Sequence, residues 1–172
     1  SPKGHNYLGA LFFDAEKSAG GFAWLDYSTG FWSGLYSKKE AELWQWVQKM
    51  QPRELLVPDL PAEVFRLPRS LDLGAITPVR LPARGAFDLK NAERRMLPAQ
   101  NIRELGAVGL NGKDELARAC GAILAYLEQT QKQELTHLAP FVPLNLSRHL
   151  IVDEIPERNL EIFRRLDGRK GP

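Results

Sequence analysis

Three apolar segments near the N-terminus, separated by short turn-forming sequences, constrain the fold more than any other feature. Residues 7–13 form a continuous apolar run that ends at Asp14, residues 22–27 form a second run, and residues 31–36 alternate large and small side chains. Glycine, serine and threonine lie between these segments, as is typical of tight turns. Apolar runs and alternating patterns of this length are typical of strands. The sequence therefore predicts a three-stranded antiparallel meander.

The following segment predicts a helix and then a fourth strand. Ser37 and Glu40 have the spacing of a capping box, in which each side chain bonds the backbone amide of the other residue. Apolar side chains recur behind this box at helical spacing, at Leu43, Trp44, Val47 and Met50. Trp46 is expected to point away from that stripe. Pro52 ends the helix, and residues 54–57 form a short apolar strand, which predicts an α/β sheet with a covering helix.

Prolines interrupt residues 60–112, where the pattern predicts one strand at 77–81 and short helices at 91–97 and 101–108. From Lys113 onward the chain predicts a long amphipathic helix. Its apolar stripe consists of Leu116, Cys120, Ile123, Leu124 and Leu127.

The remaining residues predict a linker and a short C-terminal unit. Prolines at 140 and 143 indicate a linker, residues 150–152 resemble a short strand, and residues 156–165 predict a final helix. Few apolar side chains are present in residues 139–172, so we expect a mobile tail unless it packs back.

Composition indicates a compartment rather than a function. The net charge is +2, and Cys120 is the only cysteine, which rules out an internal disulfide and suits a reducing compartment. No run of about 18 uncharged apolar residues is present, so no membrane span is expected. The first residues lack an initiator methionine and the apolar stretch of a secretory signal. We therefore expect a cytoplasmic location, and the start of the sequence fits either a piece of a longer chain or a processed tag.

Three aspartates are the candidate metal ligands. Asp14 ends the first predicted strand, Asp26 lies in the second, and Asp59 follows the fourth. In a ribonuclease H-like sheet, acidic residues at strand positions gather Mg²⁺ ions for phosphodiester hydrolysis, so a metal-dependent nuclease is one alternative. Each aspartate also adjoins a turn or a proline, where its side chain has a structural role. Phosphate-loop, zinc-protease and serine-hydrolase motifs are absent from the sequence.

A stretch rich in basic residues offers a second alternative, a sequence-independent DNA-binding module. Its basic residues are Arg66, Arg69, Arg80, Arg84, Lys90, Arg94 and Arg95. If they gathered on one face, that face would attract phosphates or an acidic partner. The competing interpretation is a solvated surface with scattered arginines.

Six short segments, in this order and at this spacing, resemble the MutS family of bacterial mismatch-repair ATPases. They are Asn6-Tyr7-Leu8-Gly9-Ala10, Leu25-Asp26-Tyr27-Ser28-Thr29-Gly30, Glu54-Leu55-Leu56-Val57-Pro58-Asp59, Tyr126-Leu127-Glu128-Gln129-Thr130-Gln131-Lys132, Leu135-Thr136-His137-Leu138 and Arg158-Asn159-Leu160-Glu161-Ile162. One departure is at residues 153–157, where a proline and acidic residues replace the small residues common in the family.

The resemblance implies a fold for this segment and places the family's catalytic and mismatch-reading functions in other domains. Residues 1–138 correspond to the connector domain, a ribonuclease H-like mixed sheet with flanking helices and no nuclease activity. Residues 139–172 correspond to the beginning of the helical core (lever) domain. The family's mismatch reader and its ATPase lie in other domains, so this segment is expected to be non-catalytic and to hold no cofactor. ATP, Mg²⁺, mismatched DNA and homodimer formation are implied for the full-length protein only.

The resemblance also implies a partner, because the connector presents a surface to the protein MutL. The stretch expected to supply that surface is polar and lies between Leu89 and Leu97. Its residues are Lys90, Asn91, Glu93, Arg94 and Arg95. The alternative is that these side chains only keep a short helix soluble.

Overall fold

The computed structural model describes residues 6–130 and 137–145. Its strands are β1 (Tyr7–Asp14), β2 (Ala19–Asp26), β3 (Trp32–Ser37), β4 (Glu54–Asp59), β5 (Thr77–Pro82) and β6 (Val142–Pro143). Its helices are α1 (Glu40–Met50), α2 (Ala83–Ala86), α3 (Leu89–Gln100), the 3₁₀ helix η2 (Leu105–Val108) and α4 (Asp114–Thr130). None of the helices in these ranges is long and apolar enough to cross a membrane.

The strands form one six-stranded mixed sheet in the order β5-β4-β1-β2-β3-β6. Strands β1, β2 and β3 are an antiparallel meander, β4 and β5 run parallel to β1 on its other side, and β6 runs parallel to β3. The predicted α/β class and mixed sheet are confirmed. The order, with β1 in the middle, also fits the ribonuclease H-like arrangement expected from the resemblance.

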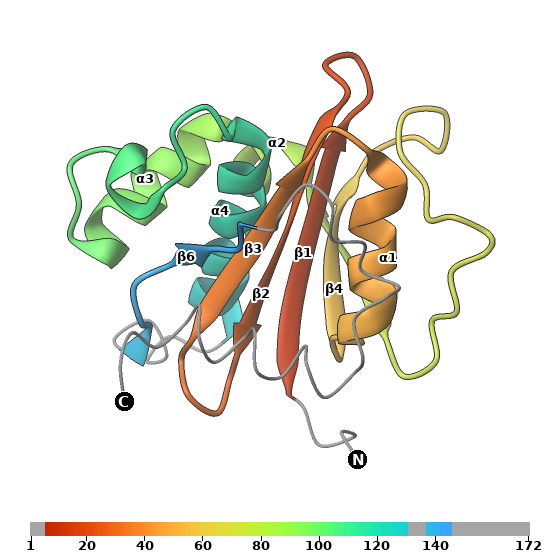
Figure 1. Ribbon diagram of the computed structural model, residues 1–172, viewed down its shortest axis with the longest axis horizontal. Coiled ribbons are helices and arrows are strands. Elements are labelled where there is room, and N and C mark those ends of the chain that lie inside the picture. The colour runs from red at the N-terminus through yellow and green to blue at the C-terminus, as the bar shows by residue number, and fades with distance from the viewer. Residues whose placement is uncertain (1–5, 131–136, 146–172) are drawn as a thin grey trace.

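Helices cover both faces of the sheet (Figure 1). Helix α1 lies on one face, and α3 and α4 lie on the other. Side chains of β1 alternate between the two cores, as strand geometry requires: Leu8 and Phe12 pack toward α4, whereas Tyr7 and Leu11 pack toward α1. Each face therefore has its own apolar core, and the sheet separates them.

Trp46 corrects one sequence prediction. We expected this side chain to point off the apolar stripe of α1, but it is only 1% exposed and stacks on Trp24 with ring centroids 6.0 Å apart. Helix α1 is covered on two sides, because the sheet contacts Trp46 while the segment after β4 brings Phe65 against Trp44. Its buried face is therefore wider than a single stripe.

The predicted capping box is also wrong. Strand β3 continues through Ser37, so α1 begins at Glu40 with Lys39 as its N-cap residue and no side-chain cap bond. The Ser37 hydroxyl instead donates to Glu42 Oε1 at 2.6 Å and accepts from the Lys39 amide at 3.0 Å. The helix ends at Met50, before Pro52, as predicted.

The helices after β5 differ in length from those predicted. Helix α3 spans Leu89–Gln100 rather than 91–97, and the helix expected at 101–108 is reduced to η2. Asn101 takes a left-handed conformation (φ 55°), and this ends α3. Helix α4 and strands β4 and β5 lie where the sequence predicts them. The strand and helix predicted at 150–152 and 156–165, and most of the expected tail, lie outside the described residues.

Candidate functional site

Helix α3, which carries the predicted partner surface, is fixed at its N-terminus by Asp88. The Asp88 carboxylate accepts hydrogen bonds from the backbone amides of Gly85 (2.6 Å) and Asn91 (3.2 Å). Burial alone would raise the pKa of Asp88, but these amide donors and the nearby Arg118 outweigh it and lower the pKa. Asp88 therefore stays charged and holds the first turn of α3 in place.

Asn91 is buried, although it belongs to the polar stretch predicted to bind MutL. It is 2% exposed, and its side-chain Nδ2 donates to the carbonyl oxygens of Ala86 (2.8 Å) and Gly121 (3.4 Å). Its Oδ1 accepts from Arg95 Nε at 2.5 Å. Asn91 thus ties α3 to α4 from inside and is not available to a partner.

The remaining four residues divide into one that braces the helix and three that face solvent. Arg95 is only partly exposed and forms an ion pair with Glu128 of α4. Lys90, Glu93 and Arg94 are exposed. The structure therefore brings these three side chains onto one outward surface of α3, while Asn91 and Arg95 support that surface from behind.

A shallow groove of about 280 Å³ adjoins this surface between α3 and α4. It is lined by Arg94, Arg95, Pro98, Ala99, Leu124 and Glu128. Its floor is apolar and its rim is charged, the combination found at protein–protein contacts.

The three aspartates do not gather at one place. Asp14 pairs with Ala19 at one end of the β1–β2 ladder and Asp26 pairs with Tyr7 at the other end. At about 3.3 Å per residue the two are separated by roughly 23 Å, too far to share a two-metal site. Among the described residues no cluster of acidic, histidine or cysteine side chains fits a metal ion.

Two of these aspartates have turn roles instead. Asp14 Oδ1 accepts from the amide of Glu16 at 3.0 Å, and Asp26 Oδ1 accepts from the amide of Ser28 at 2.8 Å. These bonds close the turns after β1 and β2.

The basic residues of the 66–95 stretch do not form one face either. Arg66 and Arg69 lie in the segment that borders α1, whereas Lys90 and Arg94 lie on α3, on the opposite side of the sheet (Figure 1). The concentrated basic surface that a DNA-binding module would use is therefore not assembled from this stretch.

Sequence reasoning missed a contact region formed by residues 139–145, which we call the strap. It was expected to be a linker, but it lies along β3. Trp32 Nε1 donates to the carbonyl of Ala139 at 2.7 Å, and Ser33 Oγ donates to the carbonyl of Val142 at 2.6 Å. Gln100, at the end of α3, accepts from the Phe141 amide at 2.6 Å.

Two apolar side chains anchor the strap, one in each of the two cores. Phe141 is 2% exposed, lies in the α4-side core and meets Trp32 edge-on at a centroid distance of 5.1 Å. Leu144 is buried in the α1-side core. The alternation of apolar residues with Pro140 and Pro143 was the available signal, because proline is tolerated on edge strands.

A partly buried tyrosine, Tyr126, links α4 to the first residue of β4, and its pKa leads to a prediction about stability at high pH. Burial and the hydrogen bond from its hydroxyl to Glu54 Oε2 (2.8 Å) raise the pKa of Tyr126 to about 12. The ordinary value is about 10. The folded state thus binds this proton more tightly than the unfolded state, so the stabilisation is complete below about pH 10 and is lost as the pH rises through 12.

Ultraviolet titration of tyrosinate absorbance checks this expectation. Tyr126→Phe should remove a late step near pH 12 and leave the earlier steps in place. Loss of a step near the ordinary value of about 10 would contradict the assignment.

Comparison with known proteins places these features in a family context. A sequence model described as MutS domain II matches residues 6–139. The chain is 64% identical over 170 residues to the DNA mismatch repair protein MutS of Nitratidesulfovibrio vulgaris (strain DP4), and 60% identical over 171 residues to that of Oleidesulfovibrio alaskensis. It is 48% identical over 170 residues to that of Lawsonia intracellularis. Each match covers 99% of this chain but only 18–19% of the relative.

Proposed function

Because this chain belongs to the MutS family of DNA mismatch repair proteins, matching its domain II, we propose that it is a non-catalytic connector that links functional parts of a longer protein. The family match over residues 6–139 carries this proposal. Most of each relative's length lies outside the match. We assign mismatch binding, ATP and Mg²⁺ binding, and the homodimer contacts to those other parts. Cytoplasmic location remains a prediction.

We place the connector domain at residues 1–138 and the start of the core domain at 139–172. The strap supports a mechanical role at this junction, because residues 139–145 are bonded to both β3 and the end of α3. Movement of the chain beyond residue 145 would be passed to the sheet through these contacts rather than absorbed by a free linker.

The second part of the proposal is that the outward surface of α3 binds MutL. Lys90, Glu93 and Arg94 supply exposed charges beside an apolar groove. Asn91 and Arg95 keep that surface in register with α4. Charged groups at the rim of an interface set partner choice and association rate more than affinity.

Reversing two of these charges tests the docking surface. Lys90→Glu combined with Arg94→Glu is expected to weaken MutL binding by roughly tenfold at moderate salt, mainly through a slower association rate. Lys38→Glu combined with Lys39→Glu changes the same charge on two exposed residues just before α1 and should leave binding unchanged. Association kinetics on immobilised MutL provide the measurement.

The same measurement should be made on the full-length MutS protein with ATP, because MutL docking can depend on the conformation that the ATP-bound protein adopts. If both double variants bind MutL as well as the parent in both settings, α3 is not the docking surface. Duplex DNA serves as the parallel ligand. Strong, steeply salt-dependent DNA binding by the chain alone would instead favour the DNA-binding alternative.

A further inference from the structure

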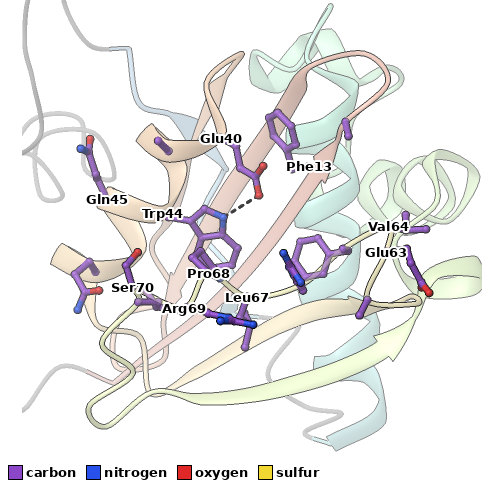
Figure 2. A pocket seen from close by; sticks show the side chains of 17 residues that line it. Phe13, Glu40, Trp44, Gln45, Glu63, Val64, Leu67, Pro68, Arg69 and Ser70 are labelled. Atoms are coloured by element: carbon purple, nitrogen blue, oxygen red, sulfur yellow. Dashed lines mark hydrogen bonds between the residues drawn. The ribbon is translucent and has the colours of Figure 1, made fainter.

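A cavity lies on the face of the sheet opposite α3. It has a volume of about 720 Å³ and is formed between α1, Phe13 of β1 and residues 62–71. Cavities of about 300–1,000 Å³ are typical of pockets that bind a small molecule, so this one has room for a peptide side chain. Figure 2 shows Phe13 and Trp44 on one side of it, and Leu67, Pro68 and Arg69 on the other.

The wall that residues 62–71 supply is held in place. Phe65 is 5% exposed and packs against Trp44, with ring centroids 6.3 Å apart. Gln48 of α1 binds the backbone of Asp72 twice, donating through Nε2 and accepting through Oε1, both at 2.9 Å. The cavity is therefore preformed, so a ligand would not have to order the loop.

Charge is distributed unevenly around the cavity. The carboxylate of Glu40 accepts a hydrogen bond from Trp44 Nε1 at 3.1 Å, drawn dashed in Figure 2. Glu63 lies with Val64 at one end, and Arg69 lies at the other. Within the described part of the chain, Arg66 and Arg69 are exposed and form neither an ion pair nor a side-chain hydrogen bond.

We propose that this cavity, which we call the α1 pocket, binds an acidic peptide segment of a partner protein. A large apolar side chain of the peptide enters between Trp44 and Leu67, and neighbouring carboxylates pair with Arg66 and Arg69. Exposed arginines bind carboxylates well, because the planar guanidinium group can donate two parallel hydrogen bonds to one carboxylate.

This site is independent of the MutL surface, since the sheet separates α1 from α3 (Figure 1). Val64 agrees with a contact role. It is 60% exposed, the one large apolar side chain so exposed among the described residues, and it lines the same cavity.

A defined pair of peptides tests the proposal on the 172-residue chain. The probe is the acetylated and amidated peptide Gly-Asp-Leu-Phe-Asp-Gly, and its control has lysine in place of both aspartates. The acidic peptide should shift the NMR signal of the Trp44 indole N–H, which borders the pocket. The basic peptide is expected to bind at least roughly tenfold more weakly.

Charge reversal on the protein completes the test. Arg66→Glu combined with Arg69→Glu should weaken binding of the acidic peptide at least roughly tenfold and improve binding of the basic peptide. Improved binding of the basic peptide would show that the variant is folded. Lys90→Glu combined with Arg94→Glu, on the other face of the sheet, should change the binding of neither peptide. Equal binding of both peptides, no binding, or loss of duplex DNA binding rather than peptide binding in the arginine variant would overturn the proposal.

Discussion

Gly21→Ala is expected to destabilise the chain by at least about 3 kcal/mol, the upper end for a core substitution that overpacks. A Cβ atom at Gly21 would lie 2.3 Å from Leu116 Cα and 2.7 Å from Leu116 N. Both are backbone atoms of α4, so no rotamer change relieves the clash. The helix would have to move away from β2, and the α4-side core would open.

Urea unfolding followed by tryptophan fluorescence measures this effect. Gly106→Ala is the matched control, because a Cβ there meets nothing closer than 3.5 Å. That change should be neutral or slightly stabilising, since alanine restricts the unfolded chain. Unfolding free energies of the two variants within about 1 kcal/mol of each other would contradict the close packing of α4 on the sheet.

Phe141→Ala is expected to cost about 3–5 kcal/mol, the usual loss for truncating a buried phenylalanine. The side chain is 2% exposed, and its removal also deletes the edge-on contact with Trp32. Loss of this anchor should free the strap. The amide of Leu144, which bonds the carbonyl of Gly34 at 2.7 Å, should then exchange its hydrogen much faster.

Val142→Ala provides the comparison for this prediction. Val142 neighbours Phe141 on the strap but is only partly buried, so its truncation should cost about 1 kcal/mol. If Phe141→Ala has no larger effect than Val142→Ala, the strap is not anchored through Phe141 and its role in coupling would fail with it.

The central part of the fold could be predicted because the pattern of apolar residues that marks each element lies within that element's own segment. The apolar runs of β1 to β4 and the stripe of α4 each report burial within one segment, and the structure confirms them. Trp46 and the strap could not be predicted in this way. Their burial depends on segments distant in sequence: Trp24 for Trp46, and β3 with Gln100 for the strap.

The candidate site was predicted only in part for a related reason. Charge and polarity along residues 90–95 indicated a helix with a polar surface, and α3 lies there, but they did not distinguish a solvent-facing residue from a buried one. Asn91 is polar and was included in the predicted surface, yet its side-chain amide donates hydrogen bonds to the carbonyl oxygens of Ala86 and Gly121. The α1 pocket left no sequence motif, because its two walls come from segments on either side of β4.

The most direct test of the central claim is amide hydrogen exchange of this chain with and without MutL, with ATP-bound full-length MutS as the second sample. The account predicts added protection on the outward side of α3, centred on residues 90–94, and little change at β5 or α1. Protection confined to another surface, or none on α3 in either sample, would contradict the assignment of this domain as a MutL-docking connector.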